Sequence, residues 1–432
     1  MTDNPSSANA ALAGVRVIDL TSVVFGPYAT QALADYGADV IKVEGPEGDS
    51  TRRIGPAREP GMASIFLGAN RNKRSVVLDL KSDAGRAALL ALTDSADVFI
   101  HNVRPQSLQR LGLSAEVMRA RNPRLVFVGL HGFGEQGPYA GAPAYDDIIQ
   151  ALSGAADLIH RQSGQPGYFP TIAADKVCGL TAVHAVLAAL FQRERSGQGQ
   201  VVEVPMFESM ASFLLVEHLY ARHLQTGPDA GAPTAADVGY PRSMARTRRP
   251  YRTADGHACV MPYSDENWRR FFAAVERPDL AADPRFATLS LRTRHIEDLL
   301  VQLTAIIEQQ PSAHWQALCE RLDIPFAPIN RLHDLEHDPH LQAVGFFQTL
   351  TDHDGQDLRF TRPPVRLSAS QVPATLPPRL GQHSAEVLGS LGLAPELLAQ
   401  LLSPAPGAAP GTAHSSDAEP DLGPDAAVRT PG

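Results

Sequence analysis

GVRVIDLTSVVFGPYATQALADYGADVIKVE, residues 14–44, is the stretch of sequence that decides the fold. Its first seven residues, GVRVIDL, are a short apolar run with β-branched side chains, which predicts a buried strand. Pro27 can begin a helix through ATQALADYG, Gly37 can end it, and ADVIKVE predicts a second buried strand. Strand, helix and strand in this order predict a βαβ unit with two parallel strands.

The same alternation continues beyond residue 44. SVVLDL and DVFIHN predict strands on either side of a helix that Ser82 can cap, and RLVFVGL after Pro123 predicts another strand. Strands that alternate with helices indicate a parallel sheet covered on both faces, so the expected fold class is α/β. The turn TSVVFGPY has one glycine and no GxGxxG motif, which argues against a nicotinamide or flavin enzyme.

Three further regions differ from this pattern. CGLTAVHAVLAALFQRER predicts a buried helix, because it has apolar residues on all sides. Residues 251–329 predict a smaller unit with a hairpin turn at Asp255 and Gly256, followed by helices that begin near Asp265, His295 and Ser312. Residues 403–432 are rich in Pro, Gly, Ala and Ser and poor in large apolar residues, which predicts a disordered tail.

Composition narrows the class of protein. The net charge of −9 over 432 residues argues against nucleic-acid binding. No window approaches the roughly 18 uninterrupted apolar residues of a membrane helix, so no membrane span is expected. Cys178, Cys259 and Cys319 stand far apart without a CxxC pair, so we expect neither a metal site nor a disulfide framework, and the cytoplasm is the expected compartment.

Several motifs, in order, resemble the family III CoA-transferases, the CaiB/BaiF group that includes carnitine and formyl CoA-transferases. They are residues 14–52, NRNKRSVVLDLKSDAGR, NVRPQSLQRLGLS, YDDIIQALSG, AADKVCGLTAVHAVLAALFQRERSGQGQVVEVPM and DIPFAPINRLHDLEHDPHLQAVGFF. The resemblance spans roughly residues 13–400. It implies a large CoA-binding domain with a parallel sheet built from both chain ends (13–225 and 331–402), a smaller α+β middle domain (226–330), and an interlocked homodimer.

Asp175, in TIAADKVCG, matches the family's nucleophilic aspartate. By position alone, an aspartate before a helix would be an N-cap, whereas the surrounding motif favours catalysis, and the two roles can coexist. A carboxylate can attack a thioester carbonyl, giving a mixed anhydride and CoA thiolate, which then forms an aspartyl-CoA thioester. Backbone N–H groups near the helix start, for example that of Gly179, could stabilise the oxyanions. CoA thioesters are then substrates, and no permanently bound cofactor is implied.

The resemblance also implies the residues that contact CoA: Val24, Leu78, Lys81, Asn102, Val103, Arg110, Leu111 and His131. Lys81 and Arg110 would meet phosphates, Asn102 would form hydrogen bonds, and the leucines with Val103 would wall the adenine. Phe25 and Tyr145 are assigned to the acyl pocket. The formyl-transferring members have glutamine, alanine and lysine at 24, 25 and 131, so formate and oxalate are in doubt as substrates.

The expected reaction moves CoA from an acyl-CoA donor, with succinyl-CoA as a candidate, to a small carboxylic or dicarboxylic acid. An arginine among Arg246, Arg248 and Arg249 could clamp a free carboxylate. Three alternatives remain open. An α-methylacyl-CoA racemase of the same fold would use a histidine where this chain has Tyr145, which is a poor base at neutral pH. The others are an isomerase that transfers CoA within one dicarboxylic acid, and an acyl-CoA-binding protein without turnover.

Overall fold

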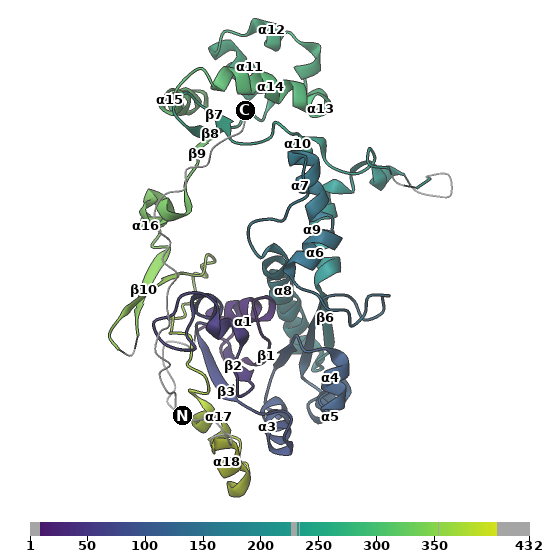
Figure 1. The fold of residues 1–432 in the computed structure, drawn as a ribbon, viewed down its shortest axis with the longest axis vertical. Coiled ribbons are helices and arrows are strands. Elements are labelled where there is room, and N and C mark those ends of the chain that lie inside the picture. Colours follow the sequence, from purple (N-terminus) through teal and green to yellow (C-terminus); the bar gives the residue numbers. More distant parts are fainter. Residues whose placement is uncertain (1–8, 226–230, 233, 353, 404–432) are drawn as a thin grey trace, which may run out of the picture.

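The computed structural model describes residues 9–225, 231–232, 234–352 and 354–403, so the predicted tail at 403–432 lies outside the described residues except for Ser403. Figure 1 shows a lobe built on a parallel sheet and a second lobe at the far end of the molecule. The chain reaches the second lobe alongside α6 (Asp146–Leu152), α7 (Ala155–Ser163) and α9 (Met206–His218), and it returns through α16 (Pro339–Ala343).

The first lobe contains a six-stranded parallel sheet in the order β3-β2-β1-β4-β5-β6. Its strands are β1 (Arg16–Leu20), β2 (Asp39–Glu44), β3 (Lys73–Val77), β4 (Val98–His101), β5 (Val126–His131) and β6 (Val201–Pro205). The predicted α/β class and parallel sheet are confirmed. Strand order reverses between β1 and β4, and the carboxyl edge of an open parallel sheet at such a reversal is where ligands bind.

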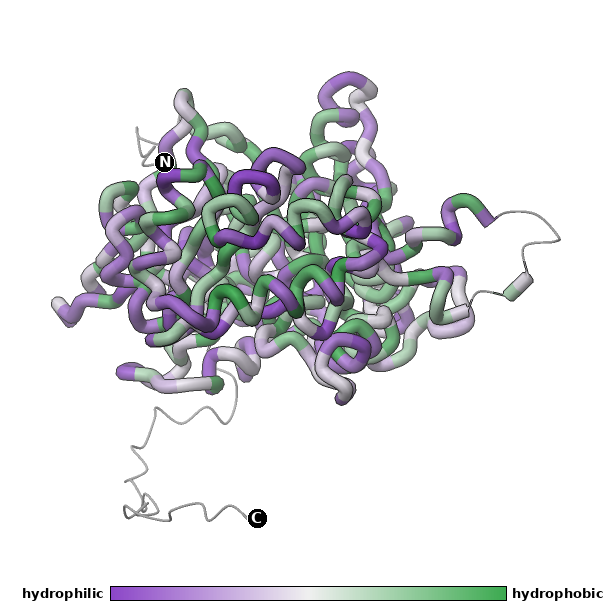
Figure 2. The backbone as a smooth tube through the Cα atoms, turned by 90° about the horizontal axis from the view of Figure 1, so that it is seen from above, coloured by the Kyte–Doolittle hydropathy of each residue, from purple (hydrophilic) through white to green (hydrophobic). Residues whose placement is uncertain are grey.

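Neighbouring residues of the central strands enter two different cores, so both faces of the sheet are covered. Val17 and Val40 belong to one core with the helices α1 (Phe25–Asp35) and α8 (Ala173–Ser196). Ile18 and Ile41 belong to the other with α3 (Asp83–Asp94), α5 (Ala115–Arg121) and the C-terminal helices. Along the exposed helices, hydrophobic and hydrophilic residues follow each other within a turn, as burial on one side requires (Figure 2).

The predicted buried helix is α8. In the described part of the chain, α8 is the helix that is long and apolar enough to cross a membrane by length and composition. One face of α8, which includes Ala182 and Val186, is packed in the core against α1 and the sheet. Burial inside the chain accounts for part of its apolar character, because 44% of the apolar window is buried, whereas Leu180 and Phe191 are exposed.

The expectation that both chain ends contribute strands to the parallel sheet is wrong. Among the described residues, all of its strands lie between residues 16 and 205. The returning chain instead forms a separate hairpin, β10 (Phe347–Thr351) with β11 (Asp357–Thr361), and then α17 (Ser384–Gly389) and α18 (Pro395–Leu402).

The returning chain meets the edge strand β3 as a loop and helix start and not as an extended strand. It uses one backbone hydrogen bond, from the His383 amide to the Ser75 carbonyl at 3.0 Å, together with side-chain contacts. The Ser75 amide donates to His383 Nδ1 at 3.2 Å, and the Val77 amide donates to Ser384 Oγ at 3.1 Å. These contacts satisfy backbone groups that an edge strand would otherwise leave open.

The second lobe has its own hydrophobic core, formed by residues between 245 and 326 that include both tryptophans. The predicted hairpin is present as β7 (Tyr251–Arg252) and β8 (His257–Val260), joined by β9 (Phe326–Pro328). The predicted helix starts agree with α11 (Asp265–Ala274), α14 (Ile296–Ile307) and α15 (Ser312–Leu322). Short helices complete the fold: α2 (Ser64–Ala69), α4 (Pro105–Arg110), α10 (Pro241–Met244), α12 (Pro278–Ala281) and α13 (Leu289–Arg294).

Docking of the C-terminal helices can be tested by truncating a buried leucine. Leu388 in α17 is fully buried in the core beside β3, whereas Leu402 in α18 is 41% exposed. Leu388→Ala should lower the free energy of unfolding by about 2 to 5 kcal/mol, and Leu402→Ala by about 1 kcal/mol or less. Denaturant unfolding followed by circular dichroism measures both, and equal losses would contradict the docked position of α17.

Candidate active site

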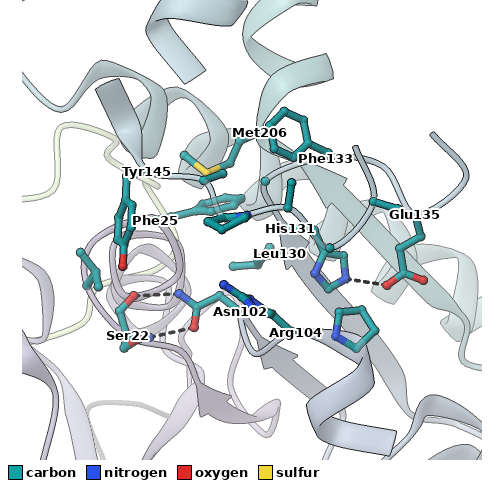
Figure 3. A pocket seen from close by; sticks show the side chains of 18 of the residues that line it. Ser22, Phe25, Asn102, Arg104, Leu130, His131, Phe133, Glu135, Tyr145 and Met206 are labelled. Carbon is teal, nitrogen blue, oxygen red and sulfur yellow. Dashed lines mark hydrogen bonds and ion pairs between the residues drawn. The ribbon is translucent and has the colours of Figure 1, made fainter. Parts of the chain in front are cut away.

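A cavity of about 380 Å³ lies at the carboxyl edge of the sheet, where the strand order reverses (Figure 3). The loops after β1, β4 and β5 and the starts of α6, α8 and α9 form its walls. The residues that line it include Ser22, Phe25, Asn102, Arg104, His131, Glu135, Tyr145, Asp175 and Met206. Figure 3 shows Tyr145 and Phe25 on one side and His131 with Glu135 on the other.

Asp175 lies in the first turn of α8 and lines the cavity. The N-cap position belongs to Ile172, so Asp175 is not the cap of this helix. Gly179 follows one turn later on the same face, and a Cβ there would lie 3.0 Å from the Phe25 carbonyl oxygen. This close approach brings the start of α1 to the first turn of α8, where the Phe25 amide forms a hydrogen bond with the Asp175 carboxylate.

Asp146, at the start of α6, supplies the cap that Asp175 does not. Its Oδ1 accepts from the amides of Ala174 at 2.7 Å and Asp175 at 3.3 Å. Gln150 Nε2 donates to its Oδ2 at 2.6 Å, and Gln150 Oε1 accepts from the Phe169 amide at 2.8 Å. A buried carboxylate from another helix thus satisfies two free amides of α8 and fixes the position of its first turn.

The surroundings of Asp175 change its acidity. Burial is the main cause that raises its pKa to about 6, and the nearby Asp146 charge adds to the effect, while the Phe25 hydrogen bond works against it. Most Asp175 is therefore ionised at neutral pH, yet its carboxylate is more basic than that of an aspartate in water. Such a carboxylate is partly desolvated and available for attack on an acyl group.

The loops after β1 and β4 are joined across the strand reversal. Asn102 Nδ2 donates to the Ser22 carbonyl at 2.9 Å, and the Ser22 amide donates to Asn102 Oδ1 at 3.1 Å (Figure 3). The predicted CoA-binding residue Asn102 therefore already uses both ends of its amide within the protein. Asn102 lines the cavity, its contact with CoA stays a prediction, and its hydrogen bonds to Ser22 give it a structural role.

Two basic side chains at the cavity differ in charge. Burial lowers the pKa of His131 although Glu135 and Glu203 oppose this, so the ring is neutral at pH 7, and its Nε2 lies 3.2 Å from Glu135 Oε1. His131 therefore does not replace the fixed positive charge of a lysine. Arg104 is exposed, and none of the described residues forms an ion pair with its side chain.

The structure brings together five of the predicted residues: Phe25, Asn102, His131, Tyr145 and Asp175 all line the cavity. The others lie outside its walls. Val24 is buried, Leu78 is in the core beside Val103 and Leu111, and Lys81 and Arg110 are exposed. All except Val24 follow β3 or β4 at the same edge of the sheet, so their contact with CoA stays a prediction.

The structure corrects two further expectations, about the oxyanion donor and about the arginine clamp. Gly179 lies inside α8, where its N–H is committed to the helix, so it is a packing residue and not an oxyanion donor. The arginines at 246, 248 and 249 are exposed between α10 and β7 and do not line the cavity.

The sequence reasoning missed Asp146, Arg104 and Glu135. The acidic pair Asp146 and Asp147 at the start of a predicted helix was visible in the sequence. That Asp146 caps a different helix could not be predicted, because this depends on tertiary contacts. For metal binding, the described residues include no group of three or more His, Cys, Asp or Glu side chains that could hold an ion.

Comparisons with known proteins agree with this fold and show the family of the chain. The model of CoA-transferase family III matches residues 12–384. The chain is 35% identical to the succinate–glutarate CoA-transferase of Agrobacterium fabrum over 90% of this chain and 98% of that protein. It is 34% identical to the succinyl-CoA:mesaconate CoA-transferase of Haloarcula hispanica over 89% and 97%.

A CAIB/BAIF family protein from Brucella suis has a solved structure that superposes with a TM-score of 0.72 at 31% identity, covering 89% of this chain and 100% of that one. The family match spans the sheet, the cavity and most of the returning segment. The chain therefore belongs to CoA-transferase family III.

Proposed function

We propose that this enzyme transfers CoA from an acyl-CoA such as succinyl-CoA to a small dicarboxylic acid, with Asp175 as the covalent nucleophile. The observation that carries the proposal is the position of Asp175, a partly desolvated carboxylate that lines a cavity at the ligand-binding edge of the sheet. The named reactions of the relatives, which involve succinate, glutarate and mesaconate, support the substrate class.

The reaction can proceed as two acyl exchanges that need no net proton transfer. The Asp175 carboxylate attacks the thioester carbonyl, the C–S bond breaks, and CoA leaves as a thiolate. The thiolate attacks the aspartyl carbonyl of the mixed anhydride and releases the donor acid as a carboxylate. The acceptor carboxylate then attacks the aspartyl-CoA thioester, and the same steps run in reverse. Loss of the anhydride to water is limited by the burial of the site.

Arg104 is our candidate for binding the free carboxylate of a dicarboxylic acid. Its guanidinium lines the cavity without an ion-pair partner among the described residues, and a planar guanidinium pairs well with a carboxylate. The other charged groups of the cavity wall, Asp175 and Glu135, would repel an anion. We therefore assign Arg104 to the acid and the exposed Lys81 and Arg110 to the CoA phosphates.

Two other reactions of this fold are weaker candidates. A racemase needs a second base, and the residue in that place is Tyr145, whose side chain is 71% exposed. An isomerase that moves CoA within one dicarboxylic acid would use the same Asp175 chemistry, and it differs in needing no separate acceptor.

We also propose that the enzyme works as a cytoplasmic, interlocked homodimer. Support for the dimer comes from large apolar side chains on α8 and α9 that one chain leaves in water, namely Leu180, Phe191, Phe213, Leu215 and Val216. Support for the compartment comes from the three cysteines, which are all free.

The covalent role of Asp175 predicts a trapped intermediate. After incubation with succinyl-CoA and hydroxylamine, mass spectrometry should find a hydroxamate on the peptide that contains Asp175. Asp175→Asn should abolish both the adduct and CoA transfer, because an amide lacks the nucleophilic oxygen. Asp147→Asn, an exposed aspartate on α6, is the matched control and should retain both.

Unlabelled Asp175 across several acyl-CoA donors would contradict the transferase mechanism. Exchange of the α-hydrogen of a 2-methylacyl-CoA in D₂O, without loss of the thioester, would favour the racemase instead. Conversion of a single acyl-CoA without an added acid would favour the isomerase.

The raised pKa of Asp175 predicts the pH dependence of its acylation. Only the carboxylate is nucleophilic, so the single-turnover rate should rise through about pH 6 and level off above about pH 7. Asp146→Asn removes a negative charge that raises the Asp175 pKa, so the midpoint should move to lower pH. Asp147→Asn should leave the midpoint unchanged. A midpoint near the ordinary aspartate pKa in the native enzyme would contradict this account.

The assignment of Arg104 predicts a selective loss of acceptor binding. Arg104→Gln should raise KM for glutarate roughly 10-fold or more, because a charge-assisted hydrogen bond is lost, and should change KM for pentanoate little. Steady-state kinetics with both acids at fixed succinyl-CoA measures this. A rise in KM for succinyl-CoA alone would assign Arg104 to CoA phosphates and contradict the proposed clamp.

A further inference from the structure

The loop between β1 and α1 has a strained backbone at Val23. Its φ angle is +69°, in the left-handed region that a β-branched residue rarely adopts. Two residues later the Phe25 backbone is packed against the start of α8, where a Cβ on Gly179 would lie 3.0 Å from the Phe25 carbonyl oxygen, and the Phe25 backbone lowers the pKa of the neighbouring Asp175 carboxyl. A conformation of this kind persists only where surrounding contacts hold it, and such positions are concentrated at functional sites.

Side chains from outside the loop occupy the backbone hydrogen-bonding groups of Thr21, Ser22 and Val23. The Thr21 amide donates to Asp19 Oδ1 at 3.0 Å, and its carbonyl accepts from Lys42 Nζ at 2.8 Å. Asn102 holds both backbone groups of Ser22. The Val23 amide donates to Asp49 Oδ1 at 3.3 Å. The loop is therefore held by residues outside it, of which Lys42, Asp49 and Asn102 are distant in sequence.

Lys42 and Asp49 form one unit behind this loop. Lys42 Nζ donates to Asp49 Oδ2 at 2.9 Å, and the two side chains are 0% and 1% exposed. Asp49 Oδ1 also accepts from the amide and hydroxyl of Thr51 at 3.0 and 2.8 Å, so it caps the short helix Ser50–Arg53 and is itself fixed. Neither residue lines the cavity, so neither can contact the reacting atoms directly.

Other charges make this unit rigid. Glu44 forms a two-point ion pair with Arg52, at 2.8 and 2.7 Å, and its Oε1 accepts from the Asp49 amide at 3.0 Å. Lys73 pairs with Asp19 at 3.1 Å and also donates to the Pro27 carbonyl in α1. Buried ion pairs contribute little net stability compared with apolar packing of the same volume, so their value here is better sought in geometry.

The loop has little room to relax. A Cβ on Gly26 would lie 2.3 Å from Thr21 Cβ, so the start of α1 is pressed against the residue that Lys42 holds. A shift of Thr21 or Val23 is therefore passed to Phe25 through tight contacts.

We propose that Lys42 and Asp49 are positioning residues, which hold the strained loop 21–23 so that the Phe25 amide is directed at the Asp175 carboxylate. This inference rests on the proposed function, because it gives the loop a role in the reactivity of Asp175. It predicts that loss of Asp49 slows acylation of Asp175 while CoA still binds, since displacement of a reacting group by about 1 Å can cost roughly 100-fold in rate.

The test compares Asp49→Ala and Asp49→Asn with a matched control in the full-length enzyme. Asp49→Asn keeps the size and one acceptor oxygen, so it carries the test if the alanine variant does not fold. The control is Asp35→Asn, which breaks the Arg71 ion pair at the other end of α1, where the two side chains are 7% and 6% exposed. For each variant we would measure Tm, the Kd of CoA by calorimetry, the single-turnover rate with succinyl-CoA, and the pKa of Asp175 by carboxyl carbon NMR.

In Asp49→Ala, Asp175 should be acylated roughly 10- to 100-fold more slowly than in the native enzyme, with Kd for CoA within about 3-fold of the native value. The acylation rate of Asp49→Asn should lie between those of the native enzyme and Asp49→Ala. The Asp175 pKa should rise in both, because the Phe25 hydrogen bond that lowers it is weakened. Asp35→Asn should lower Tm and leave the rate and the pKa unchanged.

The inference is overturned if the Asp49 variants keep the native rate and Asp175 pKa, or if Asp35→Asn slows acylation as much at equal loss of Tm. Failure of the proposed function has a different signature. In that case the native enzyme is not acylated at Asp175, and the change of the Asp175 pKa in the Asp49 variants still decides whether the loop is positioned as inferred.

Discussion

The close contact between α1 and α8 is the constraint on which the candidate site depends. Gly179 leaves no side chain between the helices, and the Phe25 carbonyl lies where a Cβ would have only 3.0 Å of space. Asp175, one turn earlier on the same face of α8, is thereby placed beside the Phe25 amide. The parallel sheet provides the rest, because its strands all end at one edge and their loops converge there. The close packing of α1 against α8 thus also determines the surroundings of the Asp175 carboxylate.

Burial also determines which of two candidate nucleophiles on α8, the Asp175 carboxyl or the Cys178 thiol, is ionised at neutral pH. Asp175 and Cys178 lie on the same helix, one turn apart, and both are desolvated. Burial, with a smaller effect of the Asp175 charge, raises the pKa of the Cys178 thiol to about 12, so it stays protonated and unreactive at neutral pH. The same burial brings the Asp175 pKa only to about 6, which leaves it ionised. Of these two candidate nucleophiles on the helix, the carboxylate is therefore the one that is anionic at neutral pH. Asp146 has two roles here, since it caps α8 and raises the basicity of Asp175.

Sequence and structure agree best where the signal is local. Residues 14–44 predicted two parallel strands and a helix, and β1, α1 and β2 are found there. Contacts between distant segments were not predictable in this way. In the sequence, Asp19 and Lys42 are only polar residues within apolar strands. In the structure they are paired in register on β1 and β2, and both form hydrogen bonds with the backbone of Thr21 in the loop after β1. The C-terminal return was expected to contribute to the parallel sheet and instead forms a separate antiparallel hairpin and helices.

The sequence by itself determined the α/β class, the family resemblance and the identity of Asp175 as the candidate nucleophile, because periodicity and motifs are properties of neighbouring residues. Only the tertiary structure decided that Asp146, not Asp175, caps α8, that Leu78 is in the core, and that Arg104 faces the cavity. Those facts depend on which surfaces meet after folding. The acidity of Asp175 also belongs to the tertiary structure, because desolvation and the field of Asp146 arise only when segments 29 residues apart are packed together.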